Sequence, residues 1–324
     1  MSTQPPVLEL NNLSKSYGTR LALDDVTLLV ETGITGLLGP NGSGKSTMIK
    51  SILGLLRIQS GSASVMGFQL PKDARQIRDA VGYLPEDDCF IAGLSGIESV
   101  RFMAELSGLP GMEALRRSHE ALDFADVGQE RYRNVETYST GMRQKLKFAQ
   151  AIVHDPEFII LDEPTSGLDP EQRISMLRKI RNLAHEHGKS ILISTHILHD
   201  VKTVCRQVVI MSQGKIRLVD TLENLSRPTR SGVLVELDSR EPSTAEEQFP
   251  ESARFAQCLT QQGYEVESRQ KGTLWVSGID DSNVQSIWQK AVEANVTICG
   301  MGSATNSLEE VFFNAVKEAE HATA

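Results

Sequence analysis

The segment 39–47, GPNGSGKST, constrains the fold of this chain more than any other part of the sequence. It matches the phosphate-binding loop pattern, in which a glycine and four further residues precede Gly-Lys-Ser. An apolar run over 34–38 comes before it and is typical of a buried strand, whereas apolar residues at helical spacing follow over 48–53. The pattern therefore predicts a loop that joins a strand to a helix and binds nucleotide phosphates.

The residue types in this loop suit phosphate binding. Glycines let the backbone turn tightly and direct its N–H groups at phosphate oxygens without a Cβ in the way. The helix start adds free N–H donors and the positive end of the helix dipole. Lys45 is predicted to reach the β- and γ-phosphates, and the Ser46 hydroxyl to hold Mg²⁺. The predicted phosphate-binding residues are Gly39, Pro40, Asn41, Gly42, Ser43, Gly44, Lys45, Ser46 and Thr47.

The composition excludes several broad classes. The 324 residues suffice for one large domain and a small one. A net charge of −9, from 33 basic and 42 acidic residues, argues against a general nucleic-acid binder. The four cysteines form neither a metal spacing nor a disulfide framework. No run approaches the roughly 18 apolar residues of a membrane span, and the N-terminus lacks signal-peptide features, so we expect a cytoplasmic chain.

Short apolar runs that alternate with helical patterns predict an α/β fold with a parallel sheet. A helical insertion over about 95–135, broken by GLPG at 108–111, interrupts this alternation. The predicted nucleotide-binding domain covers 1–230. Its predicted strands are 7–13, 21–30, 34–38, 63–68, 81–84, 158–162 and 190–195, with a hairpin over 208–219.

A second domain is predicted over 231–324, after a polar segment. Its signals run strand, helix, strand, strand, helix, strand, which indicates a small ferredoxin-like α+β unit. A last helix is predicted to begin at Ser307, which with Glu310 has the spacing of a capping box. This domain shows no catalytic cluster, so it serves either docking and dimerisation or the stability of the first domain.

The segment FIILDEP supplies the acidic partners that a phosphate-binding loop needs. A strand that ends in Asp162 places a carboxylate beside Mg²⁺, through a bound water. Glu163 follows directly and is predicted to orient or deprotonate a water that attacks the γ-phosphate.

Five motifs in this order make the chain resemble the ATP-binding cassette (ABC) family: GPNGSGKST, YSTGM followed by RQKL, FIILDEP, SGLD and STH. The resemblance covers about 7–225. It implies a P-loop cassette with a helical subdomain. It also implies a head-to-tail dimer, in which the signature sequence of one subunit, YSTGM at 138–142, contacts the γ-phosphate on the loop of the other.

The resemblance also implies individual roles. Tyr17 would stack on adenine, and Ser139 and Gly141 match the signature sequence. Asp169 would communicate across the dimer, and His196 would contact the γ-phosphate and position the attacking water. The signature departs from the commonest form, LSGGQ, at Thr140 and Met142, so its contacts are expected to be adjusted rather than lost.

The clearest departure from the family pattern is Glu86, where many members have glutamine. A glutamate oxygen can still bind Mg²⁺, so the predicted metal residues are Ser46, Asp162 and Glu86. An ionised glutamate cannot donate a hydrogen bond. The alternative is that Glu86 belongs to a solvated acidic loop with Asp87 and Asp88.

The implied function is that of an ATPase subunit that binds ATP–Mg²⁺ as a dimer and drives a separate membrane permease. Its expected location is the cytoplasmic face of the membrane, held there by the permease. The variant signature, Glu86 and the ending SLEEVFF resemble ABC-2 type exporters. No nucleic-acid partner is expected.

Other classes stay open. A cassette ATPase that acts on ribosomes or DNA would usually carry two cassettes in one chain or a long coiled coil. A regulatory module without turnover would not need Lys45, Asp162, Glu163 and His196 intact. A P-loop kinase would need an acceptor site in place of the signature.

Overall fold

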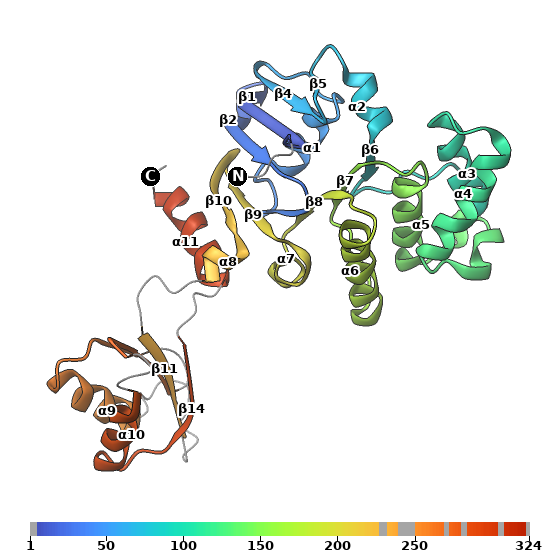
Figure 1. Cartoon of the computed structure of the whole chain (residues 1–324). Helices are drawn as coiled ribbons and strands as arrows, with labels where there is room; N and C mark the ends of the chain where they lie inside the picture. Colours follow the sequence, from blue (N-terminus) through green and yellow to red (C-terminus); the bar gives the residue numbers. More distant parts are fainter. Residues whose placement is uncertain are drawn as a thin grey trace. The chain divides into compact units, whose positions relative to one another are not determined.

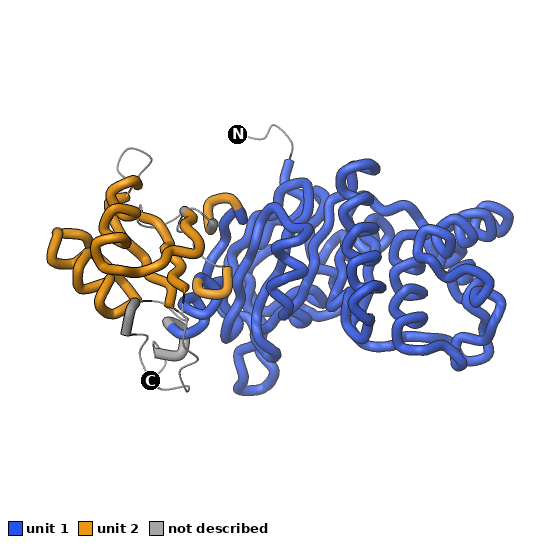
Figure 2. The backbone as a smooth tube through the Cα atoms, turned by 90° about the horizontal axis from the view of Figure 1, so that it is seen from below, with its two compact units in different colours: residues 1–222, 311–324 blue, residues 223–310 orange. Residues whose placement is uncertain are grey.

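The computed structural model of this protein describes residues 5–226, 232–238, 250–268, 272–279, 284–303 and 308–321. They belong to two compact units, residues 1–222 with 311–324 and residues 223–310 (Figure 2). The predicted domains, 1–230 and 231–324, stay a prediction. The main difference is that the last residues, 311–324, group with the first unit.

An antiparallel sheet forms one layer of the first unit, in the order β2-β1-β4-β5. Its alternating apolar residues are buried, as Leu8 and Leu10 show, because successive side chains of a strand point to opposite faces. The first strand is longer than the predicted 7–13 and ends at Tyr17. The strands are β1 (Leu8–Tyr17), β2 (Arg20–Val30), β4 (Ser60–Val65) and β5 (Phe68–Gln69).

A second sheet runs through the centre of this unit in the order β10-β9-β3-β8-β7-β6. All its pairs are parallel except the β9–β10 hairpin, which confirms the predicted α/β class. Strands β3, β7 and β8 are buried along their whole length, as parallel strands covered on both faces require. The strands are β3 (Ile34–Leu38), β6 (Val81–Leu84), β7 (Phe158–Asp162), β8 (Ser190–Thr195), β9 (Gln207–Ser212) and β10 (Lys215–Thr221).

The register of the central sheet brings three predicted motifs to one edge. Leu38 pairs with Thr195, and Asp162 pairs with Ser194, so β3, β7 and β8 end level with one another. The segments that follow these strands therefore begin side by side at the carboxyl edge, where ligands bind in open parallel sheets.

Helix α1 (Lys45–Ile52) lies between the two sheets (Figure 1). Its Met48, Ile49 and Ile52 are fully buried in one apolar core with residues from both sheets. The phosphate loop is thus attached to a rigid, packed helix. Three further helices of this unit are α2 (Ala74–Ala80), α6 (Pro170–His185) and α7 (Leu198–Val204). Helices α6 and α7 lie on the other side of the central sheet (Figure 1).

The predicted helical insertion forms a subdomain of its own at one end of the unit (Figure 1). Ser95 starts it with a complete capping box, since its hydroxyl accepts from Glu98 N and the Glu98 carboxylate accepts from Ser95 N. The first two helices are separated at GLPG, as predicted. The subdomain contains α3 (Gly96–Leu106), α4 (Gly111–Phe124), the 3₁₀ turns Gly128–Tyr132 and Val135–Thr137, and α5 (Thr140–Ile152).

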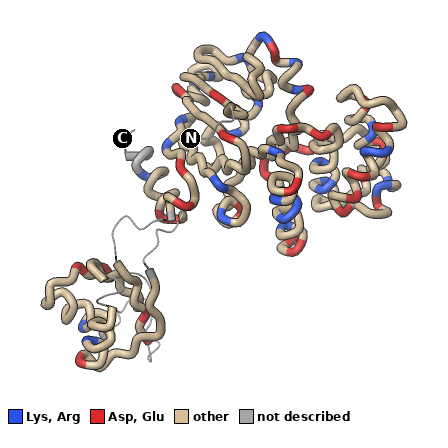
Figure 3. The backbone as a smooth tube through the Cα atoms, in the orientation of Figure 1, with Lys and Arg blue, Asp and Glu red and all other residues tan. Residues whose placement is uncertain are grey.

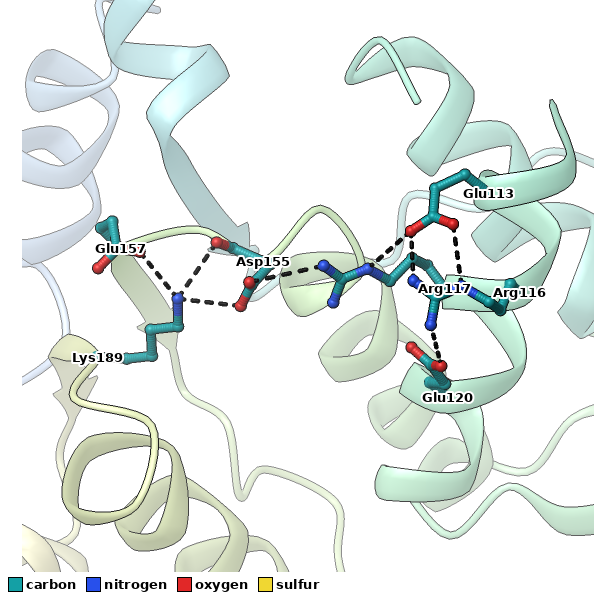
Figure 4. Close-up of polar contacts among 7 residues, drawn as sticks. All are labelled: Glu113, Arg116, Arg117, Glu120, Asp155, Glu157 and Lys189. Carbon is teal, nitrogen blue, oxygen red and sulfur yellow. Dashed lines mark hydrogen bonds and ion pairs between the residues drawn. The ribbon is translucent and has the colours of Figure 1, made fainter. Parts of the chain in front are cut away.

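An ion-pair network joins α4 to the loop before β7 (Figure 4). Arg117 Nη2 lies 3.7 Å from Asp155 Oδ2, and Lys189 Nζ lies 3.0 Å from the other oxygen of the same carboxylate. Glu157 also pairs with Lys189, at 3.1 Å. Asp155 and Glu157 are largely exposed, so these ion pairs contribute little to the stability of the fold.

The second unit has the predicted strand and helix order. Its sheet is antiparallel in the order β12-β13-β11-β14, the arrangement of a ferredoxin-like unit. The predicted capping box at Ser307 lies outside the described residues. The elements are β11 (Gly232–Leu237), α9 (Pro250–Gln261), β12 (Val266–Ser268), β13 (Thr273–Ser277), α10 (Val284–Glu293) and β14 (Ile298–Ser303). Two further helices of the described residues are α8 (Leu222–Ser226) and α11 (Leu308–His321).

Within the described residues, no helix is long and apolar enough to cross a membrane. Acidic and basic residues are interspersed along the helices of the first unit (Figure 3).

Candidate nucleotide-binding site

An open cavity of about 960 Å³ lies at the carboxyl edge of the central sheet. It is lined by the loop residues Pro40 to Thr47 and by Tyr17, Glu86, Asp162 and Glu163. The structure therefore brings together four segments for which site residues were predicted: Tyr17, the phosphate loop, Glu86 and the end of FIILDEP.

The glycines of the loop are required by close backbone contacts. A Cβ on Gly39 would lie 2.4 Å from Met211 O, and one on Gly44 would lie 2.7 Å from Ala22 O. Gly44 also has φ +110°, a backbone conformation that residues with side chains rarely adopt. Any larger residue at these two positions would displace the loop from the hairpin and from β2.

Lys45, the first residue of α1, lies across the loop. Its Nζ donates to Gly39 O at 2.7 Å and to Pro40 O at 3.2 Å. A phosphate oxygen is a stronger acceptor than these carbonyls, so the ammonium can transfer to a bound phosphate. Burial lowers the pKa of this amine, against the opposing effect of three nearby carboxylates: Glu163, Asp162 and Glu86.

Asp162 ends β7 and is 1% exposed, and its Oδ1 has no hydrogen-bond partner. Burial raises the pKa of Asp162; the hydroxyls of Ser194 and Ser46 lower it, and the carboxylates of Glu86 and Glu163 raise it. A buried oxygen without a donor, close to other carboxylates, suits a bound cation. A hydroxyl and two carboxylates beside phosphate oxygens are the oxygen ligands that Mg²⁺ uses.

These ligands do not form a metal site by themselves. Among the described residues, no group of three or more His, Cys, Asp and Glu side chains could hold a metal ion. In the predicted arrangement, the phosphates of the nucleotide would complete the ligand set of Mg²⁺, as is usual for this ion.

Glu163 follows β7 with its side chain fixed by two neighbours. His196 Nδ1 lies 2.8 Å from Oε1, and the Thr195 hydroxyl donates to Oε2 at 3.3 Å. The Glu163 backbone has φ +51°. Its N–H donates a hydrogen bond to Ser194 O, and its carbonyl accepts one from Gln144 Nε2. A buried carboxylate in a fixed direction, open to the phosphate cavity, can orient a water molecule and accept its proton.

Of the residues that support Glu163, the sequence pointed to His196 but gave no individual role to Thr195 or Gln144. Thr195 and Gln144 lie 32 and 19 positions away in the chain. They stand in the STH and RQKL motifs, but neither residue had an expected role of its own. Such partners become visible only when β8 and α5 are packed beside β7.

Tyr17 also lines the cavity, and its side chain is half exposed. Arg20 and Leu21 line the cavity beside it, and the Lys15 ammonium lies 5.5 Å from the centre of its ring. The aromatic ring is thus available to a planar base, in an environment that favours anions. The sequence carried no signal for Arg20 or Leu21.

The signature and the SGLD segment pack against each other. Ser139 caps α5 by accepting from Met142 N, and Asp169 caps α6 in the same manner. A Cβ on Gly141 would lie 2.5 Å from Gln172 Oε1, near the start of α6. The variant Thr140 is accommodated because Gly167, with φ +71°, leaves room for its methyl group.

The structure does not bring this second group to the phosphate loop. Ser139, Gly141 and Asp169 are absent from the described residues that line the cavity. His196 contacts Glu163 but is likewise outside that lining. A single subunit thus presents the phosphate loop and the signature at separate places.

Comparisons with known proteins agree on one family. The family model described as ABC transporter matches residues 23–166. The uncharacterized ABC transporter ATP-binding protein YdbJ of Bacillus subtilis (strain 168) is 33% identical over 96% of this chain and 95% of its own length. The Nod factor export ATP-binding protein I of Cupriavidus metallidurans is 34% identical over 64% of this chain and 69% of its own length.

Solved structures agree with this result. A structure titled as the ATP-binding subunit of an ABC transporter has a TM-score of 0.62 and 33% identity, covering 68% of this chain and 91% of its own. A dimeric ATP-binding cassette bound to ADP and Pi has a TM-score of 0.63 and 24% identity, covering 66% and 98%, and shares the fold. Given the similarity to YdbJ over almost the full length of both chains, this protein belongs to the ATP-binding subunits of ABC transporters, a family of ATPases.

Proposed function

We propose that this protein is the ATP-hydrolysing subunit of an ABC exporter, which closes as a head-to-tail dimer around two ATP–Mg²⁺ and drives a separate membrane permease. The observation that carries the proposal is Glu163: a buried carboxylate, held by His196 and Thr195, beside the phosphate loop. A regulatory module without turnover would have no need for this arrangement.

In the proposed reaction, the loop N–H groups and Lys45 bind the triphosphate. Mg²⁺, held by Ser46, Asp162 and Glu86, would neutralise charge that develops on the phosphates. As the water oxygen bonds to the γ-phosphorus and the bond to the β–γ bridging oxygen breaks, ADP leaves and Glu163 accepts the proton of the water. The contact with His196 would hold the carboxylate in place for this transfer.

The dimer follows from the incomplete site. Ser139 and the adjacent N–H groups at the start of α5 suit an anion, but they lie away from the cavity of their own subunit. A second copy placed head to tail would supply them to the γ-phosphate. The solved dimeric cassettes with the same fold support this assembly.

Export and a permease partner are supported by relatives rather than by the site. One relative is named for Nod factor export and another for linearmycin resistance. A separate permease would hold this protein at the cytoplasmic face, in keeping with relatives that are named as ATP-binding proteins of transport systems.

We also propose that the second unit is a docking or dimerisation module. Helix α10 buries Ile287 and Ala291, but its Trp288 is 47% and its Val292 80% exposed. These two apolar side chains lie one turn apart on α10, and we propose them as part of the surface that contacts a partner.

Purification from membranes tests the proposed function. A tagged protein with Glu163→Gln and ATP–Mg²⁺ is expected to bring down a multi-span membrane protein, because the substitution should preserve the ATP-bound dimer. If ribosomes or DNA are recovered instead, with no multi-span protein, the transporter proposal is wrong and the alternative class of cassette ATPase applies.

Replacing Tyr17 by Ala is expected to weaken ATP binding about tenfold, since stacking of a base on an aromatic ring contributes about 1–3 kcal/mol. Tyr17→Phe should bind within about twofold of the parent, because the ring alone stacks. Titration of a fluorescent ATP analogue measures both. Equal affinity of Tyr17→Ala and Tyr17→Phe would contradict a stacking role.

A further inference from the structure

The segment that follows β6, residues 85–90, is held by a buried lysine of α5. Lys147 is 3% exposed, and its Nζ donates to Pro85 O at 3.1 Å and to Glu86 O at 2.9 Å. The same ammonium lies 3.7 Å from Asp88 Oδ1. Its three N–H donors thus match two carbonyls and one carboxylate.

A second basic side chain of α5 reinforces this contact. Arg143 lies one helical turn before Lys147, on the same face of the helix. Its Nη1 donates to Asp88 Oδ2 at 3.0 Å, and its guanidinium lies 5.8 Å from the centre of the Phe90 ring. Segment 85–90 is therefore bound to α5 at several points along its length.

Glu86 is held by its backbone on one side and faces the nucleotide cavity on the other. Its carbonyl accepts from Lys147, whereas the residue lines the cavity with Asp162 and Lys45. A carbonyl held by a buried ammonium restricts the backbone from which the Glu86 side chain extends. This contact therefore limits the positions that the Glu86 carboxylate can take in the cavity.

We propose that Lys147 is a positioning residue, which holds the Glu86 carboxylate at the metal end of the nucleotide cavity and connects it to the signature helix. This inference rests on the proposed function, because it takes ATP–Mg²⁺ as the ligand. Ser139 starts the same helix two turns before Lys147. In the proposed dimer, Ser139 would contact the nucleotide on the loop of the other subunit. Because α5 carries both Ser139 and Lys147, this contact would influence the position of Glu86 in its own subunit.

The Mg²⁺ dependence of nucleotide binding tests this role. A fluorescent ATP analogue is bound to the full chain with Glu163→Gln, to prevent turnover, and Mg²⁺ is titrated. With Lys147→Met, the Mg²⁺ concentration that gives half of the maximal increase in nucleotide binding is expected to rise about tenfold. Loss of a residue that supports a metal ligand usually weakens metal affinity by about 10- to 100-fold, and this value is the lower end of that range. Affinity without Mg²⁺ should change less than about twofold.

Lys145→Met is the matched control, because it removes the same charge from the same helix at a position without a contact to segment 85–90 among the described hydrogen bonds and ion pairs. It should leave the Mg²⁺ dependence unchanged. If Lys147→Met fails to fold, Arg143→Met tests the same contact, because the less buried Arg143 also binds segment 85–90. The Mg²⁺ concentration for half-maximal binding is then expected to rise about threefold.

A double substitution separates positioning from general stability. If Lys147 acts through Glu86, Lys147→Met should add no further shift in Mg²⁺ dependence to a protein that already carries Glu86→Gln. Additive shifts, or a Lys147→Met protein that behaves as Lys145→Met, would overturn the positioning role alone. If nucleotide affinity does not depend on Mg²⁺ in the protein that carries Glu163→Gln alone, the proposed metal site is wrong, and with it the role of Lys147.

Discussion

Replacing Glu163 by Gln is expected to lower kcat for ATP hydrolysis about 10³-fold, within the usual contribution of a general base. Glutamine has nearly the same shape, so its amide can keep one contact with His196 or Thr195, but it cannot accept a proton from water. ATP affinity should stay within about threefold, because the loop and Lys45 bind the phosphates. Phosphate release by the protein with its permease measures the rate.

The same substitution should make the ATP-bound dimer persist, since hydrolysis is what separates the two subunits in the proposed cycle. Size-exclusion chromatography with ATP–Mg²⁺ is expected to show a dimer for Glu163→Gln and a monomer after ATP is removed. Glu157→Gln, at the amino end of β7 and far from the cavity along that strand, is the matched control and should hydrolyse ATP normally. Parental turnover by Glu163→Gln would show that another group is the base.

Replacing Asp162 by Asn is expected to have two opposite effects. ATPase activity should fall about 10²- to 10³-fold, because the neutral amide no longer balances the charge of Mg²⁺. The metal-free protein should become more stable by about 1 kcal/mol, since a buried carboxylate without a donor at Oδ1 and near two other carboxylates is unfavourable there. Functional residues often carry such a cost in stability.

The direction of the pKa shift gives the pH dependence of this gain. The folded state raises the pKa of Asp162, chiefly through burial, so it binds this proton more tightly than the unfolded state does. The stability that Asp162 contributes is therefore full below its unfolded pKa, about 3.9, and is lost as the pH rises through the folded value. Asn has no such loss.

Consequently, the stability advantage of Asp162→Asn should be small near pH 4 and should grow toward neutral pH. Urea unfolding in EDTA at several pH values measures it. Asp79→Asn, in an exposed pair with Arg75, should show no such growth. An advantage that shrinks as the pH rises would contradict the assigned shift, and Mg²⁺ with ATP should remove the advantage at neutral pH.

Much of the first unit could be predicted because its signals are local. The loop pattern lies between a buried strand and a helix, and both were found at the predicted places, with β3 as Ile34–Leu38 and α1 from Lys45. The helical insertion was found by its change of period and by the break at GLPG. Hydrophobic periodicity and turn residues act over a few positions, so the sequence displays them directly.

The supporting contacts of the site could not be predicted, because they join residues that are distant in the chain. Thr195 and His196 reach Glu163 only because β7 and β8 end level with each other. Lys147 looks like one more charged residue of an amphipathic helix, yet it is buried and bound to the Glu86 carbonyl. No local pattern distinguishes such a lysine from one that faces solvent.

The sequence by itself therefore determined the kind of chemistry: a phosphate-binding loop, an acidic strand end and a signature, each recognisable in a short segment. The tertiary structure decided which of these share a cavity. It placed the loop, Asp162 and Glu163 together and left Ser139 and Gly141 outside that lining. The physical reason is that residue types and their spacing encode local chemistry, whereas the packing of strands and helices sets the distances between segments that are far apart in the chain.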